Sequence, residues 1–189
     1  MRSLRHFPIV GLIAVSFLAW ACGETGGGGT TVATDPTGTE PGAAATVEVS
    51  LLDYAFRGLP EEVGPGTEFS VINESESELH EMVAFLLPED ETRPASDLIA
   101  LPEEEFGALV AGPPAMVLLA PPGGEMVTAV GDGTLTDPGR YLVVCAIPLG
   151  ADPQEYLDAA AQSGDEPPEV EGGPPHFTQG MFGEVTVGG

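Results

Sequence analysis

The sequence has 189 residues, with 30 acidic side chains against five basic ones and a formal charge of −25 at pH 7. A chain this acidic repels the phosphates of nucleic acids, so a nucleic-acid-binding function is excluded. The sequence contains no phosphate-binding loop, nucleophile elbow or His-Glu-x-x-His motif. It also lacks the His-x-His pairs of multicopper oxidases. We therefore do not expect an enzyme.

The first 22 residues have the composition of an export signal. Arg2 and Arg5 precede an apolar run, residues 7–21, that is short for a bilayer span. The sequence Leu-Ala-Trp-Ala-Cys that ends at Cys22 is similar to the cleavage box of bacterial lipoproteins, in which the cysteine is lipidated. We therefore expect an extracytoplasmic protein that is anchored to the cell membrane through Cys22. Simple secretion and an uncleaved anchor are the alternatives.

Residues 23–45 consist mainly of Gly, Thr, Ala and Pro and have no periodic apolar pattern. Such a segment cannot bury enough surface to offset its chain entropy, so we expect a flexible linker. It would span roughly 25–30 Å, from about 5–6 Å times the square root of its length. Residues 46–189 then have the size of one domain.

Short apolar segments, several of them alternating with polar residues, recur through residues 46–189, and Pro and Gly separate them. Strands are predicted at 47–51, 67–72, 79–87, 115–119, 125–130, 141–145 and 184–187. Short strands with frequent turn signals favour an all-β fold, a Greek-key β-sandwich.

Short helical insertions are expected within this sandwich. Residues 96–101 and 103–109 could each form one or two helical turns. A stronger signal begins at Asp152, where Asp, Pro and Glu form a capping-box pattern. The apolar stripe that follows, which includes Tyr156 and Leu157, predicts a helix from Pro153 to Gln162.

Four side chains of the predicted domain form a donor set typical of copper. His80 and His176 are its only histidines and Cys145 its only cysteine, because the other histidine and cysteine lie in the export segment. Met181 follows His176 after a gap of four residues. Two imidazoles and one thiolate in a trigonal arrangement, with a long axial thioether, hold type 1 (blue) copper. Cys145 also has no partner for a disulfide, which an exported thiol would otherwise tend to form.

Each donor has a structural alternative. A single histidine in an apolar strand is often a packed residue, a lone buried cysteine behaves as a small hydrophobe, and a methionine commonly fills a core. Zinc is the alternative metal, but one thiolate, two imidazoles and no carboxylate at ligand spacing fit its structural sites poorly.

The order of the donors along the chain resembles the cupredoxins, the small blue copper proteins. The likeness covers residues 46–189, and its most specific parts are the Pro-Gly-Arg-Tyr approach at 138–141 and the gap before Met181. Two features depart from that family. Thirty residues separate Cys145 from His176, where only a few are usual, and Glu81 replaces the small polar residue that often follows the first histidine.

The resemblance implies a cupredoxin-like sandwich with one copper ion, held by His80, Cys145 and His176 and by Met181 as the weak axial donor. It implies a carrier of single electrons that meets a redox partner protein, and the acidic surface would favour a basic partner. The alternative is a copper-holding or metal-free binding module at the cell surface. A carrier should expose an imidazole edge within an apolar patch, whereas a binding module should bury that edge under the insertion after Cys145.

Overall fold

The computed structural model describes residues 45–163 and 167–189. The predicted export segment with Cys22, and all of the predicted linker except Ala45, lie outside these residues. No helix in the described ranges is long and apolar enough to cross a bilayer. The strands are β1 (Thr46–Leu52), β2 (Ala55–Arg57), β3 (Glu62–Val63), β4 (Thr67–Asn73), β5 (His80–Leu86), β6 (Met116–Ala120), β7 (Val127–Val130), β8 (Thr134–Leu135), β9 (Gly139–Val144) and β10 (Phe182–Val187).

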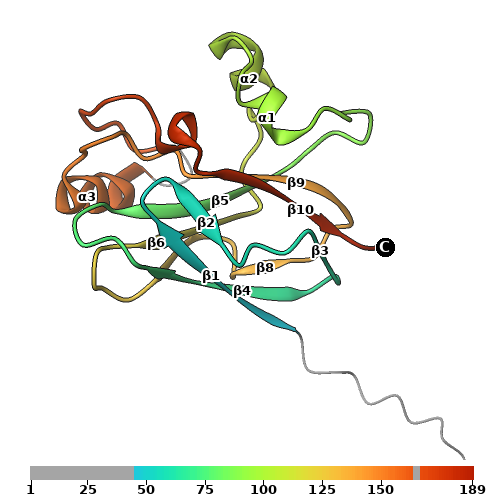
Figure 1. The fold of residues 1–189 in the computed structure, drawn as a ribbon, viewed down its shortest axis with the longest axis horizontal. Helices are drawn as coiled ribbons and strands as arrows, with labels where there is room; N and C mark the ends of the chain where they lie inside the picture. Colours follow the sequence, from blue (N-terminus) through green and yellow to red (C-terminus); the bar gives the residue numbers. More distant parts are fainter. Residues whose placement is uncertain (1–44, 164–166) are drawn as a thin grey trace, which may run out of the picture. The chain divides into compact units, whose positions relative to one another are not determined.

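The strands form two sheets that face each other (Figure 1). The smaller sheet has the order β2-β1-β4-β8, and the larger one the order β3-β10-β9-β5-β6-β7. Consecutive strands change sheet on either side of β3, between β4 and β5, and on either side of β8, as in Greek-key sandwiches. The predicted all-β sandwich is therefore confirmed. Every predicted strand is present, and the sequence pattern missed only the short strands β2, β3 and β8.

The core lies between the two sheets and follows the alternation read from the sequence. Val49 and Leu51 of β1 are fully buried, whereas Glu48 before them is exposed and Ser50 between them is partly exposed. β5 and β9 are buried along most of their length, because both of their faces are covered. One continuous apolar cluster joins both sheets and includes Cys145 and Met181.

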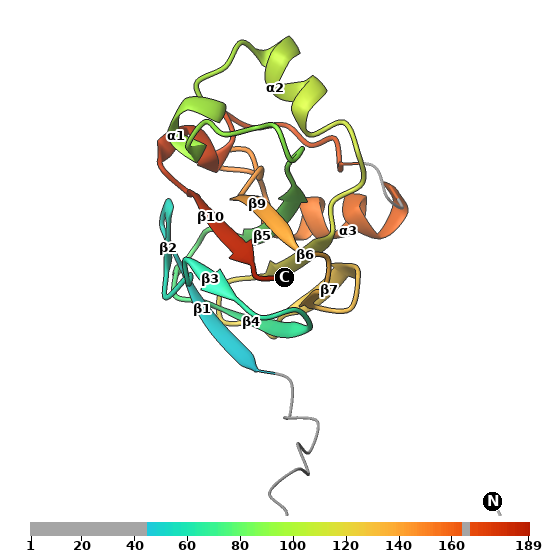
Figure 2. The same ribbon diagram turned by 90° about the vertical axis from the view of Figure 1, so that its right-hand side faces the viewer.

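Two helices cover the outer face of the larger sheet (Figure 2). These are α1 (Ala95–Leu98) and α2 (Glu103–Leu109), both inserted between β5 and β6. Leu98 is fully buried in a second apolar cluster with residues of β5 and β9. The predicted helix at 96–101 is shorter than expected and ends at Leu98, whereas the prediction for 103–109 is confirmed.

A third helix, α3 (Pro153–Ser163), lies in the long segment between Cys145 and His176. The Asp152 carboxylate accepts hydrogen bonds from the backbone N–H groups of Gln154 and Glu155, both at 2.9 Å. These bonds satisfy two of the N–H groups that a helix leaves unpaired at its start, so the predicted cap is confirmed. Tyr156 is buried and Leu157 packs on the main core, as the apolar stripe predicted.

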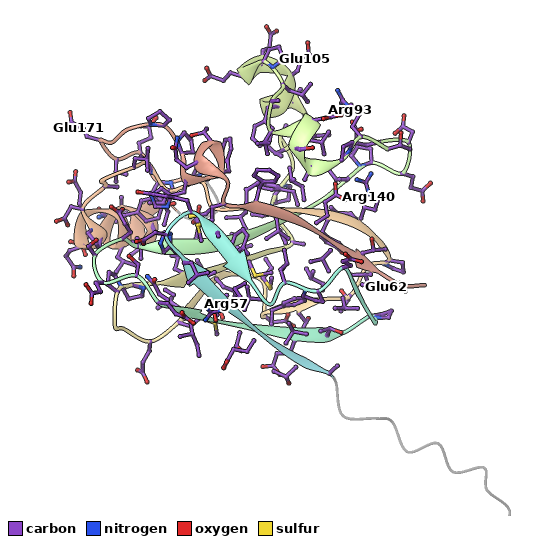
Figure 3. All side chains as sticks on the ribbon, in the orientation of Figure 1. Arg57, Glu62, Arg93, Glu105, Arg140 and Glu171 are labelled. Atoms are coloured by element: carbon purple, nitrogen blue, oxygen red, sulfur yellow. The ribbon has the colours of Figure 1, made fainter. Side chains whose placement is uncertain are left out.

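The arginines of the described residues all contact carboxylates. Arg57 pairs with Glu74, Arg93 with Glu91, and Arg140 with Glu184. Arg140 also donates to the backbone carbonyls of Glu91 and Arg93, at 2.6 and 2.9 Å, and so ties the segment before α1 to β9. Figure 3 shows Arg93 and Arg140 on the side of the molecule that carries α1 and α2. The remaining acids leave the surface strongly negative.

Candidate metal centre

Three predicted donors come together where β5 begins and β9 ends. His80 is the first residue of β5, and Cys145 directly follows β9. The two strands are antiparallel neighbours, with Val83 opposite Val144, so the start of one lies beside the end of the other. His176 opens the short 3₁₀ helix η1 (His176–Gln179) after the long insertion. All three side chains are completely buried.

The donor atoms are spaced as for a common ion. The Nδ1 atoms of His80 and His176 are 3.2 Å apart, and Cys145 Sγ lies 3.4 Å from Nδ1 of His176. One ligand atom from each residue lies within 4.8 Å of the other two. Two nitrogens at about 2.0 Å from an ion, at a trigonal angle, would be separated by roughly 3.5 Å, and a sulfur at about 2.3 Å slightly more. The two printed separations are close to those of a trigonal metal ion, and the three donors lie near enough to share one ion.

Met181 is held beside this cluster by its backbone. The N–H of Cys145 donates to the Met181 carbonyl at 3.1 Å, and the N–H of Met181 donates to the His176 carbonyl at 3.3 Å. The turn between them closes at Gly180, whose φ of 116° is a conformation that favours glycine. The Met181 side chain is completely buried in the same apolar cluster as Cys145. This position is compatible with the axial role expected from the sequence.

Glu81 connects the thiol to the insertion. Its backbone N–H donates to Cys145 Sγ at 3.4 Å, and its carboxylate accepts from the N–H of Ala146 at 3.0 Å and the Tyr156 hydroxyl at 3.2 Å. The side chain is buried, and burial raises the pKa of Glu81 to about 7. The unusual residue after His80 therefore binds α3 and the residue after Cys145 together.

Burial also sets the charge of the donors. It lowers the pKa of His80 and lowers that of His176 to about 4, so both imidazoles are neutral at neutral pH. Burial is likewise the main cause that raises the pKa of the Cys145 thiol. To bind a metal, a histidine must have an unprotonated ring nitrogen and a cysteine must be a thiolate. A bound cation would stabilise the negative charge of a buried thiolate.

The long insertion is closed at its base by backbone hydrogen bonds. The N–H groups of His176 and Phe177 donate to the carbonyls of Ile147 and Cys145, both at 2.9 Å. Farther out, Leu149 donates to the Pro174 carbonyl at 3.1 Å and accepts from Gly173 at 2.9 Å. We call this ladder, residues 145–149 against 173–177, the insertion stem. The stem therefore holds the two ends of the insertion close together.

The outer edges of both imidazoles face carboxylates that the sequence analysis did not single out. Nε2 of His80 lies 3.5 Å from Asp53 Oδ1, and Nε2 of His176 lies 3.6 Å from Glu78 Oε2. The Tyr54 ring meets the His176 ring edge to face, with ring centroids 5.1 Å apart. Glu78 stands only two positions before His80, and Asp53 follows a predicted strand, but among 30 acids neither position is distinctive.

Neither imidazole edge is exposed, in contrast to the expectation for a simple electron carrier. The groups that face the Nε2 atoms come from the β1–β2 turn and from the segment before β5, and so do not belong to the insertion. The buried edges differ from the expectation for an electron carrier. The groups that cover them differ from the expectation for a binding module, in which the insertion would cover the edge.

The fold and the site together define a two-sheet sandwich with a buried cluster of one thiol and two imidazoles. Among solved structures, the chain is similar to auracyanin A, a "blue" copper protein from the thermophilic photosynthetic bacterium Chloroflexus aurantiacus, at 18% identity and a TM-score of 0.41. That match covers 77% of this chain and 99% of the other. Dithionite-reduced auracyanin from Roseiflexus castenholzii gives 20% identity, coverage of 78% and 100%, and a TM-score of 0.38.

Auracyanin B matches at 18% identity over 76% of this chain and 88% of its own, with a TM-score of 0.34. No family model and no curated protein matches the sequence. At these identities and TM-scores, a function can be assigned only from the site's own geometry.

Proposed function

We propose that this protein is a type 1 copper protein that carries single electrons outside the cytoplasm. The observation that carries the proposal is the buried cluster of His80, Cys145 and His176, whose donor atoms all lie within 4.8 Å of one another. Met181 is the proposed axial donor. Bound there, copper would take up and release one electron by cycling between Cu(II) and Cu(I).

The donor set favours copper over zinc. Structural zinc sites use four strong donors, usually with two or more thiolates, and catalytic zinc sites keep a position open to water. This cluster offers one thiol and two imidazoles and is closed to solvent. A soft thiolate with imidazoles and a weak thioether is the combination that copper prefers.

The fold holds the proposed copper ligands in fixed positions. His80 and Cys145 belong to paired strands, Cys145 is tied to Met181 through the backbone, and the insertion stem fixes His176. A site held from three sides changes little between the two oxidation states, and electron transfer then requires little reorganisation.

The charge of the surface supports a basic redox partner. The chain carries a net charge of −25, and each arginine of the described residues is already paired with a carboxylate. An acidic surface of this kind accelerates the association of a positively charged protein and loses that effect at high salt. The proposed lipid anchor at Cys22, followed by the linker of residues 23–45, would keep the domain at the membrane surface where it could meet such a partner.

The complete burial of both imidazoles also favours a second candidate, a copper-holding or metal-free binding module. Electrons would have to enter through the groups that cover the imidazole edges, and a protein that only stores copper would have no such requirement. Measuring electron self-exchange in the copper-loaded protein separates the two candidates, because a storage module would exchange electrons slowly.

Copper loading tests the proposal directly. Adding one equivalent of Cu(II) to the purified protein is expected to give an intense visible absorption from thiolate-to-copper charge transfer, with one copper bound per chain. Visible absorption and metal analysis of the same sample provide the measurement. A protein that binds one copper tightly but remains colourless would contradict a type 1 site.

Met181→Leu is expected to retain copper and colour but to raise the reduction potential, because a weak axial donor stabilises the oxidised ion. An increase of about tenfold in the Cu(I)-to-Cu(II) affinity ratio would correspond to about 59 mV. Met116→Leu is the matched control, since Met116 is equally buried but lies in β6. Loss of copper from the Met181 variant, or an equal shift in both variants, would disprove the axial role.

A further inference from the structure

The Nε2 atoms of His80 and His176 are the buried side-chain nitrogens that lack a hydrogen-bond partner among the described residues. Burying a polar N–H without a partner is unfavourable, so native structures rarely leave such atoms unpaired. Each of these two atoms faces one carboxylate oxygen, Asp53 at 3.5 Å or Glu78 at 3.6 Å. Those distances are just beyond a hydrogen bond, and a small rotation of either acid would close the gap.

The backbone conformation around Asp53 places its carboxylate beside Nε2 of His80. Asp53 and Tyr54 form the two-residue turn between β1 and β2, with Leu52 paired to Ala55. Tyr54 has a φ of 65°, the only positive φ of a non-glycine among the described residues. A bulky side chain adopts that conformation at an energetic cost, and such strain concentrates at functional sites. Here it puts the tyrosine ring against His176 and the neighbouring carboxylate against His80.

Glu78 is positioned by a separate set of bonds. Its N–H donates to Ser75 Oγ at 2.9 Å, and its carbonyl accepts from the Asn73 side chain at 2.8 Å. The same Asn73 amide donates at 2.7 Å to the carbonyl of Ala120, the residue that pairs with His80 across β5 and β6. The segment that carries Glu78 is therefore fixed to the strand pair that carries the first histidine.

We infer that Asp53 and Glu78 are positioning residues of the metal centre, each accepting the Nε2–H of one histidine so that its Nδ1 is left unprotonated for the metal. This inference rests on the proposed copper function. A metal-bound histidine usually donates its other ring N–H to a carboxylate, carbonyl or water, which fixes the ring and makes it a stronger donor.

Carboxylates at both imidazoles also bias the oxidation state. Negative charge close to the ion stabilises Cu(II) more than Cu(I), so removing either charge should raise the reduction potential. The effect should be larger for Glu78, whose side chain is 22% exposed, than for Asp53, which is 61% exposed and better screened by water. The reduction potential should therefore rise more when the Glu78 charge is removed than when the Asp53 charge is removed.

The test compares Asp53→Asn, Glu78→Gln and the control Glu76→Gln. The control removes the same charge from an exposed residue two positions before Glu78. In the metal-free wild type, ring ¹⁵N chemical shifts should give the Nε2–H tautomer for both histidines, and each site variant should shift its own histidine toward Nδ1–H. In the copper-loaded protein, Glu78→Gln should change the Cu(I)-to-Cu(II) affinity ratio by about tenfold, with a smaller change for Asp53→Asn and almost none for Glu76→Gln.

The proposed copper function and the positioning role of Asp53 and Glu78 can be overturned separately. A wild type that takes up no copper would overturn the proposed function, while the tautomers of the metal-free protein would still decide the role of the carboxylates. Rings in the Nδ1–H form, or site variants whose tautomers and potentials match those of Glu76→Gln, would overturn the inference even in a fully blue protein.

Discussion

Cys145→Ser is expected to abolish the visible absorption of the copper-loaded protein and to weaken Cu(II) binding by more than about 100-fold, since losing even an outer-shell contact can cost that much. A serine hydroxyl cannot supply the sulfur orbital from which the charge-transfer transition starts, and it is far harder to deprotonate than a thiol. Cys145 is completely buried and has no disulfide partner among the described residues, so its thiol is available to a metal. Absorption spectroscopy and competition with a copper chelator measure the two effects.

Cys22→Ser is the matched control, because it removes the chain's other cysteine. It should retain the colour and the copper affinity in full. If the colour survived in the Cys145 variant, or disappeared with Cys22→Ser, the thiolate assignment would be wrong. Comparing the thermal unfolding of both metal-free variants separates a lost ligand from a lost fold.

Replacing both Tyr156 and Leu157 with Ser is expected to release copper about 10-fold faster or more, the scale of other outer-shell changes. It should also broaden the electron paramagnetic resonance signal. Tyr156 is buried, and its hydroxyl donates to Glu81, whose N–H in turn contacts the sulfur of Cys145. If the substitutions detach α3 from the core, the buried Glu81 carboxylate loses the hydrogen bond from Tyr156. The segment that follows Cys145 would then be held less firmly. The sandwich itself should remain folded, because its core lies between the sheets.

Two further variants show which contact is responsible. Gln154→Ser with Asp158→Ser alters the exposed face of α3, where the Gln154 amide donates to the Asp158 carboxylate, and should leave copper release unchanged. Tyr156→Phe keeps the packing but removes the hydroxyl. A spectrum and release rate identical to the wild type in the Tyr156/Leu157 double variant would show that α3 does not support the centre.

The clustering of the candidate metal ligands was predictable because so few residues could compete for the role. With two histidines and one cysteine in the whole domain, counting and chain order were enough to select the cluster that the structure brings together. The helix α3 was predictable for a local reason, since its cap and apolar stripe lie within a dozen residues. Strands with alternating or continuous apolar residues were likewise apparent, because burial of one or both faces leaves a pattern in the sequence.

The features that were missed depend on contacts between distant segments. β3 has two residues and exists only because Glu62 and Val63 pair with Thr186 and Val187. Just outside the insertion stem, Gly172 approaches Pro148 so closely that an added Cβ would overlap the Pro148 side chain, and no local pattern indicates that contact. Asp53 and Glu78 are ordinary acids in an acidic chain until the fold brings them to the imidazoles.

The long-range pairing of the strands determines when the centre can form. β10 binds β9 on one side and, through a parallel pairing, the early strand β3 on the other, so it joins the two ends of the described chain. Such contacts close large loops and form late and slowly during folding. Met181 immediately precedes β10, and His176 lies just before it. A partly folded chain would thus present His80 and Cys145 without His176 and Met181, and the proposed metal centre would be complete only after β10 has paired.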